Sequence, residues 1–221
     1  MTGLSQSQTA WLQAIFGDRF TDRRVERKLY SHDIGEMPSM IKPLIGNTLA
    51  DAIVQPASEA EIVALVQWVA REGIPLIPRG KATSGYGGVL PVKGGVVVDF
   101  VRMAKVLDVD VEAQTATLQP GIVWEKADRE IKKQGMTLRT YPSSYPSATA
   151  GGWLAQGGAG FGGYEAGWFR DNVVSARVIL GDGSLGLFEG DDLDMIYEAE
   201  GTTGIITQLT IKIQPDEEIE V

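Results

Sequence analysis

Apolar side chains recur at helical spacing in three stretches of the chain, which predicts amphipathic helices over residues 9–16, 58–73 and 123–134. The second helix has the clearest limits. Ser58 followed by Glu61 is typical of a capping box at a helix start, and Gly73 is typical of a helix end. These helices are separated by shorter apolar runs of a different period.

The shorter apolar runs predict β-strands, at residues 52–54, 74–78, 96–100, 106–111, 115–119, 173–180, 185–188 and 205–213. Strand, helix and strand over 52–78 indicate a parallel βαβ unit, whereas Asp182-Gly183 indicates a hairpin. We therefore expect an α+β fold. Its predicted parts are an N-terminal helical and irregular segment over 1–49, a first lobe over about 50–110, and a second over about 115–215.

Two glycine-rich stretches interrupt this pattern, at residues 78–88 and 142–160. Both combine glycine with small hydroxyl residues and carry almost no acidic charge. Glycine adopts positive φ without strain, and successive backbone N–H groups in such turns can bind an anion. Neither a Walker A sequence nor the usual dinucleotide fingerprint is present in the first stretch. The two stretches therefore suggest one long ligand with a charged middle, bound in another way.

Composition narrows the classes of partner and chemistry. The formal net charge of −9 at pH 7 argues against nucleic acid or an anionic membrane surface as the main partner. The chain has no cysteine and one histidine, His32, so we expect no thiolate or multi-histidine metal site. No apolar run approaches the roughly 20 residues that span a bilayer. We expect a cytoplasmic protein.

Six blocks, in this order, resemble the FAD-binding domain of the vanillyl-alcohol oxidase/p-cresol methylhydroxylase type. They are residues 52–62, 74–88, 98–103, 117–121, 142–152 and 201–207. The resemblance covers about residues 30–215 and is closest to the glycolate oxidase/D-lactate dehydrogenase branch. It implies an α+β, two-lobed domain, here without the C-terminal cap domain that follows it in full-length relatives.

The resemblance implies the residues that contact FAD. The first set is Pro78, Arg79, Gly80, Lys81, Ala82, Thr83, Ser84 and Gly88. The second set is Pro142, Ser143, Ser144, Thr149, Gly151, Gly152 and Gly158, and the third is Gly204, Ile205 and Ile206. We expect the backbone amides of residues 79–84 to bind the pyrophosphate. The second set is expected to contact the other side of the diphosphate and the flavin ring, and residues 204–206 are expected to lie beside the adenine.

The chain departs from the family pattern at three places. Lys81 and Ala82 replace glycines that are common after Arg-Gly, and Trp153 stands where the family usually has asparagine. Thr83 occupies the position of the histidine to which some members attach FAD covalently. The cofactor is therefore expected to be non-covalent.

The implied function is that of an FAD-binding domain or subunit of an FAD-dependent oxidoreductase. It would oxidise a 2-hydroxy acid of the glycolate or D-lactate type by hydride transfer to flavin and pass electrons to an acceptor. One alternative is a flavin-carrying electron-transfer subunit that needs a partner chain for substrate binding. A weaker alternative is an NADPH-dependent reductase of the enolpyruvyl-sugar type. Catalytic residues are not assigned, because the family's substrate site lies mostly in the cap domain.

Other side chains have competing interpretations. The aromatic residues near the second stretch could frame a ligand or pack the core, namely Trp153, Phe161, Tyr164, Trp168 and Phe169. We interpret Arg170-Asp171-Asn172 as a loop ion pair and residues 191–194 as a solvated acidic turn. We interpret His32 as a surface or interface residue. Arg139 and Tyr141 remain modest candidates for the flavin or substrate side.

Overall fold

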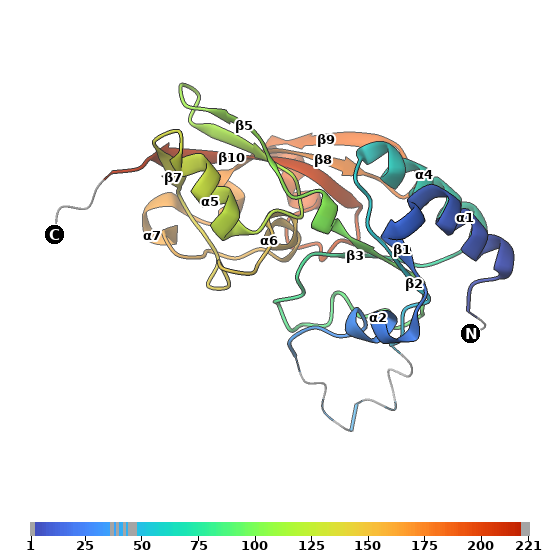
Figure 1. Cartoon of the computed structure of the whole chain (residues 1–221). Helices are drawn as coiled ribbons and strands as arrows, with labels where there is room; N and C mark the ends of the chain where they lie inside the picture. The colour runs from blue at the N-terminus through green and yellow to red at the C-terminus, as the bar shows by residue number, and fades with distance from the viewer. Residues whose placement is uncertain (1–2, 36–37, 39, 42, 44–47, 218–221) are drawn as a thin grey trace. The chain divides into compact units, whose positions relative to one another are not determined.

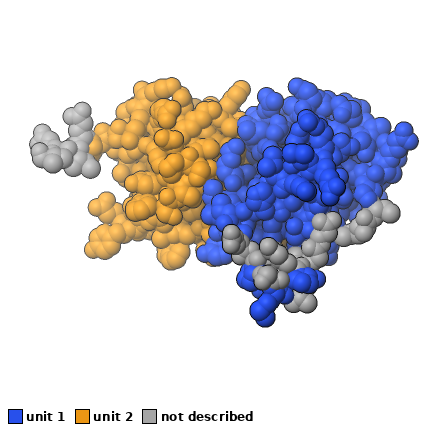
Figure 2. Space-filling model, turned by 60° about the horizontal axis from the view of Figure 1, so that its bottom comes forward, with its two compact units in different colours: residues 1–102, 181–184 blue, residues 103–180, 185–221 orange. Residues whose placement is uncertain are grey.

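The computed structural model describes residues 3–35, 38, 40, 41, 43 and 48–217. Part of the irregular stretch expected near the N-terminus therefore lies outside the described residues. The chain divides into two compact units, residues 1–102 with 181–184, and residues 103–180 with 185–221 (Figure 2). They are called unit 1 and unit 2 below. Each contains its own sheet with helices, and the predicted α+β class is confirmed.

The sheet of unit 1 has the strand order β1-β2-β4-β3. Its strands are β1 (Phe20–Thr21), β2 (Ala52–Val54), β3 (Leu76–Arg79) and β4 (Val96–Asp99). Both β2 and β3 pair with β4 in parallel, whereas β1 pairs with β2 antiparallel. The predicted βαβ unit is present, and its two strands flank β4. Strand β1 was not predicted, because two residues carry no periodicity.

Helix α4 (Glu59–Glu72) connects β2 to β3 and has the predicted limits. Ser58 Oγ accepts a hydrogen bond from the Glu61 N–H, and Gly73 ends the helix in the left-handed conformation at φ +67°. The Glu61 side chain differs from the predicted capping box. Its carboxylate accepts from the Ala57 N–H and pairs with Arg19, so it links the helix to the N-terminal segment.

The N-terminal segment packs helix α1 (Gln6–Phe16) against α4 (Figure 1). The Trp11 and Trp68 rings stack with their centroids 4.3 Å apart and their planes 5° from parallel. Helix α1 begins three residues before the predicted start, because Ser5 and Gln8 form a capping box. The 3₁₀ turn Gly17–Arg19 and the short helix α2 (Arg24–Leu29) follow, and the 3₁₀ turn Phe100–Arg102 comes after β4.

Unit 2 is built on an antiparallel sheet of order β5-β6-β10-β8-β9, with β7 pairing the end of β10. Its strands are β5 (Val106–Asp110), β6 (Thr115–Leu118), β7 (Met136–Leu138), β8 (Val173–Ile179), β9 (Leu185–Glu189) and β10 (Ile205–Pro215). The expected boundary placed β5 in the first lobe. It lies in unit 2 because it forms a hairpin with β6.

The described residues of unit 2 also form the helices α5 (Trp124–Lys132), α6 (Ala150–Gln156) and α7 (Gly163–Ala166) and the 3₁₀ turns Phe169–Asn172 and Gly190–Met195. The core centres on the fully buried Trp124, whose ring lies edge-on to Trp153 and Phe169 at centroid distances of 5.4 Å. Trp153 and Phe169 stack at 3.9 Å. These two aromatic residues are therefore packing residues of the core.

Candidate functional site

The first glycine-rich stretch leaves the sheet of unit 1 at the end of β3 and forms an irregular loop over residues 80–88. Ala82 adopts φ +54° although it is not glycine, and it is only 8% exposed. The family pattern places glycine near this position, and this backbone conformation explains that preference. Gly85 and Gly87 also have positive φ, at +76° and +85°.

The middle of this loop presents backbone donors without partners. None of the N–H groups of residues 81–84 donates a hydrogen bond to another residue of the described chain. The hydroxyls of Thr83 and Ser84 are likewise bonded to no other described residue. Buried or half-buried N–H groups are nearly always paired in folded proteins. Four successive free donors therefore form a surface on which an anion can be bound.

At the start of the loop, by contrast, the residues have bonding partners within the chain. Pro78 and Arg79 belong to β3, where they pair with Val98 and Asp99. The Arg79 guanidinium donates to the backbone carbonyls of Tyr30, at 3.3 Å, and His32, at 2.9 Å. Burial lowers the pKa of Arg79, although an arginine stays protonated in proteins. Its cationic side chain is thus engaged by the chain's own carbonyls.

The second stretch lies in unit 2 and begins with a turn. The N–H groups of Tyr145 and Ala148 donate to the carbonyls of Pro142 and Ser144, at 2.9 and 2.7 Å. Within the described residues, the N–H and hydroxyl groups of Ser143 and Ser144 bond no other residue. The turn therefore presents a second, smaller group of free donors.

Gly151 and Gly152 lie in helix α6, whereas the sequence suggested a loop. The Gly151 N–H donates to the Pro120 carbonyl at 2.9 Å, and a Cβ at Gly151 would approach the Pro120 Cβ to 2.6 Å. A Cβ at Gly152 would lie 2.8 Å from Thr149 Oγ1. Gly151 thus lets α6 approach Pro120, and its N–H is not free for a ligand.

Two buried threonine hydroxyls near this stretch lack a hydrogen-bond partner among the described residues. Thr149, at the start of α6, and Thr140, before the Pro142 turn, are each 3% exposed. An unpaired buried hydroxyl is unfavourable and is often satisfied by a ligand or by water. The sequence indicated Thr149 but not Thr140. The only signal at Thr140 was its place between Arg139 and Tyr141.

The remaining expected contacts have structural partners. The Gly158 N–H donates to the Tyr197 hydroxyl at 2.8 Å. A Cβ at Gly204 would lie 2.7 Å from the Ile179 carbonyl oxygen, so this glycine allows close approach to β8. Ile205 and Ile206 are buried in β10 and pair with β8, whereas pairing with β6 begins only at Leu209.

The other candidates from the sequence fall into a group that bonds neighbouring residues and a group that is exposed. Arg170 forms an ion pair with Asp194 at 2.6 Å and also donates to the Gly190 carbonyl. His32 Nδ1 lies 3.2 Å from the Lys28 carbonyl oxygen. The exposed group comprises Phe161, Tyr164 and Trp168.

Within the part of the chain that the structure describes, no group of three or more histidine, cysteine, aspartate or glutamate residues could hold a metal ion. No described helix is both long and apolar enough to cross a membrane.

Comparison with known proteins gives matches over most of the chain. A family model described as "FAD binding domain" matches residues 50–186, more than half of the sequence. The glycolate oxidase subunit GlcD of Bacillus subtilis is 30% identical over 216 residues, covering 94% of this chain and 44% of that protein. The alkyldihydroxyacetonephosphate synthase of Dictyostelium discoideum is 33% identical, covering 91% of this chain and 35% of that protein.

One more protein and a solved structure are similar to most of this chain. The mitochondrial D-lactate dehydrogenase [cytochrome] of Arabidopsis thaliana is 32% identical over 175 residues, covering 75% of this chain and 30% of that protein. A solved structure of an alkyldihydroxyacetonephosphate synthase superposes with a TM-score of 0.84 at 30% identity, covering 97% of this chain and 45% of that chain. The present chain therefore spans less than half the length of these relatives.

Proposed function

Because this chain belongs to the FAD binding domain family, with FAD as its cofactor, we propose that it is the FAD-binding part of an oxidoreductase that oxidises a 2-hydroxy acid. The family match confirms the resemblance seen in the sequence. Two relatives are named for glycolate and D-lactate oxidation, which supports this substrate class, whereas a third is named a synthase. A cytoplasmic location stays a prediction.

The observation that carries the proposal is the run of free N–H groups at residues 81–84. The pyrophosphate of FAD is an anion, and convergent backbone donors bind such a group without a cationic side chain. In this proposal the hydroxyls of Thr83 and Ser84 add donors to the same group. When bound, FAD supplies the acceptor for a hydride; the chain supplies binding and orientation.

Unit 2, taken by itself, presents free donors of its own. Ser143 and Ser144 have free hydroxyl and N–H groups, and the buried Thr149 hydroxyl lacks a partner among the described residues. We assign these three residues to FAD contacts on that basis. Gly151, Gly158 and Gly204 stay predicted FAD contacts, and each also allows a close approach or bonds a neighbouring residue.

The loop conformation can be tested at Ala82. Ala82→Val should weaken FAD binding by at least tenfold, because a β-branched residue does not adopt φ +54° without displacing the loop. Ala82→Gly is the matched variant and should bind FAD within about threefold of wild type, because glycine adopts this conformation readily. Quenching of flavin fluorescence during titration measures both. Equal binding by the two variants would contradict the assignment.

Visible spectroscopy tests the cofactor and its attachment. Purified chain supplied with FAD should show flavin absorbance. After denaturation, the yellow flavin should pass through a filter that retains the protein. Colour that stays on the denatured chain would contradict non-covalent binding, for which Thr83 in place of a histidine is the basis. A chain that takes up no FAD under any condition would contradict the proposed role.

Anaerobic reduction distinguishes the functions. Bleaching of the flavin by glycolate or D-lactate supports hydroxy-acid oxidation, and bleaching by NADPH supports a reductase instead. A second candidate is a flavin-carrying electron-transfer subunit that needs a partner chain for substrate binding. That candidate predicts reduction by dithionite but by no hydroxy acid until the partner is added.

A further inference from the structure

Residues 30–35 precede the stretch matched by the family model and contact the first loop at both of its ends. At the start of the loop, the Arg79 guanidinium donates to two backbone carbonyls of this segment and lies 5.4 Å from the centre of the Tyr30 ring. At the far end, Asp33 Oδ2 accepts a hydrogen bond of 2.8 Å from the Gly87 N–H. The free N–H groups of residues 81–84 lie between these two contacts in the chain.

The segment is itself fixed to the sheet of unit 1. The Tyr30 hydroxyl donates to Asp99 Oδ2 at 2.7 Å, and Asp99 is a buried residue at the end of β4. Gln55 Nε2 donates to the same oxygen at 3.1 Å. The Ala50 N–H donates to the Ser31 hydroxyl. Because the sheet is the rigid part of the unit, these bonds give the segment a defined position from which to hold the loop.

A close backbone approach adds a steric contact. A Cβ at Gly35 would lie 2.5 Å from the Gly85 carbonyl oxygen, closer than any real Cβ contact. The Gly35 N–H meanwhile donates to Asp33 Oδ1 at 2.8 Å. One carboxylate therefore bonds both its own segment and the loop, and Gly35 leaves the space that this arrangement requires.

We propose that residues 30–35 form a clasp that holds the loop in its anion-binding conformation, with Asp33 as a positioning residue. The clasp contacts Arg79, Gly85 and Gly87 and leaves the N–H groups of 81–84 free to bind an anion. This inference rests on the proposed function, since its consequence is tighter binding of the pyrophosphate of FAD. It assigns a role in cofactor binding to a segment outside the matched domain.

The charge of Asp33 makes the test decisive. A carboxylate beside an anion-binding loop repels the pyrophosphate, so its Coulomb effect alone would make Asp33→Asn bind FAD more tightly. Positioning predicts the opposite, because asparagine offers a single acceptor oxygen in place of two. The direction of the change therefore separates the two effects.

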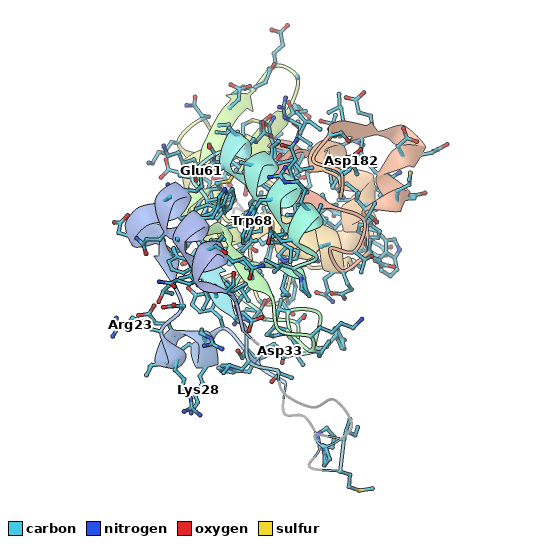
Figure 3. All side chains as sticks on the ribbon, turned by 90° about the vertical axis from the view of Figure 1, so that its right-hand side faces the viewer. Arg23, Lys28, Asp33, Glu61, Trp68 and Asp182 are labelled. Atoms are coloured by element: carbon cyan, nitrogen blue, oxygen red, sulfur yellow. The ribbon has the colours of Figure 1, made fainter. Side chains whose placement is uncertain are left out.

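Asp33→Asn should weaken FAD binding by about tenfold, the scale of losing one hydrogen bond to a charged group. Asp182→Asn is the matched control, because Asp182 Oδ1 likewise accepts from a turn N–H, that of Ser184, in the same unit. Figure 3 shows Asp33 and Asp182 at well-separated places. The control should bind FAD within about twofold of wild type.

Gly35→Ala tests the steric contact without changing charge. Its added methyl group should displace Gly85 and weaken FAD binding to a similar or greater degree than Asp33→Asn. Gly181→Ala is the matched control, since a Cβ there meets nothing within 4 Å. The thermal midpoint of each variant establishes that it is folded before its affinity is compared.

Two readouts separate positioning from general destabilisation. Affinity for ADP, which contains the pyrophosphate without the flavin, should fall in the same proportion as affinity for FAD. Amide hydrogen exchange of the cofactor-free protein should quicken at residues 80–88 in Asp33→Asn and Gly35→Ala, and stay unchanged in both controls. Folded variants with wild-type FAD affinity and wild-type exchange would overturn the clasp. If wild type itself binds no FAD, the proposed function fails, while the exchange data still test the clasp.

Discussion

At the scale of single residues, Asp128 organises the turn that carries Ser143 and Ser144. This buried carboxylate on α5 accepts hydrogen bonds from Thr137 Oγ1, at 2.8 Å, and from the Tyr145 hydroxyl, at 3.0 Å. It also pairs with Lys132 at 3.2 Å. A buried carboxylate with several partners is stable, but each partner becomes costly to remove. We therefore expect Tyr145 to fix the second stretch as the clasp fixes the first.

Tyr145→Phe should lower the free energy of unfolding by about 1 kcal/mol at pH 7. Burial, with the hydrogen bond to Asp128, raises the pKa of Tyr145 to about 12 from its ordinary value of 10.0. A raised pKa means that the folded state keeps the proton longer. This stabilisation is therefore complete below pH 10 and is lost as pH rises from about 10 to about 12. Urea unfolding across this range should show a steeper loss in wild type than in Tyr145→Phe.

The control for this measurement is Tyr164→Phe, because Tyr164 is fully exposed in the same unit. Its pH profile should follow that of wild type. Parallel alkaline profiles for wild type and Tyr145→Phe would contradict the role of this hydroxyl.

Residue roles could be predicted from the sequence only where they are local. The composition of residues 78–88 indicated an anion-binding loop, and the family resemblance named the residues. Neither indicated that Arg79 is engaged by carbonyls 47 and 49 positions away in the chain. Nor did either indicate that the Gly151 N–H donates to the Pro120 carbonyl. Such pairings depend on tertiary contacts that a single sequence does not display.

At the scale of elements, the ion pair of Arg19 with Glu61 joins the N-terminal segment to α4. Two guanidinium nitrogens donate to the two carboxylate oxygens at 2.6 and 2.8 Å, and both side chains are about one-fifth exposed, at 21% and 24%. This bidentate geometry is the strongest form of the interaction. Together with the stacking of Trp11 on Trp68, it holds α1 in place.

Glu61→Gln should reduce the free energy of unfolding by about 1 kcal/mol at pH 7. The hydrogen bond from Arg19 lowers the pKa of Glu61 below its ordinary value. The carboxylate thus stabilises the fold above pH 4.5, and this contribution is lost as pH falls through the lowered pKa. Urea unfolding at pH 7, 5, 4 and 3 should show the difference from wild type shrinking. Glu26→Gln, which removes the ion pair with the exposed Arg23, should change stability by less than about 0.5 kcal/mol.

The elements that were predicted well have local end signals. Ser58 and Gly73 set the limits of α4, and Asp182-Gly183 lies at the turn between β8 and β9. Helix α6 was missed because glycine at 151 and 152 disfavours a helix. Burial of Trp153 and Leu154 against the core outweighs that preference. Strand β7 was missed because the polar Thr137 interrupts its three residues, whereas the equally short β2 is a continuous apolar run.

At the scale of the whole molecule, the net charge of −9 opposes the approach of an anionic cofactor. Backbone N–H groups attract an anion only over short distances. Because the Arg79 guanidinium is bonded to backbone carbonyls, Lys81 is the exposed cation within the loop. Salt screens charges that are more than about 10 Å apart at 0.1 M. Ionic strength therefore separates the long-range repulsion of FAD by the net charge from its short-range attraction by the N–H groups.

We expect the association rate of FAD with the cofactor-free protein to rise a fewfold between about 10 mM and about 300 mM salt. The dissociation rate should change less, because short contacts with backbone N–H groups are poorly screened. Stopped-flow flavin fluorescence measures both rates, and riboflavin, which lacks the pyrophosphate charge, serves as the control with a flat profile. Lys81→Gln should leave the slope positive. An association rate that falls with salt would show instead that a local positive field, centred on Lys81, outweighs the charge of the whole chain.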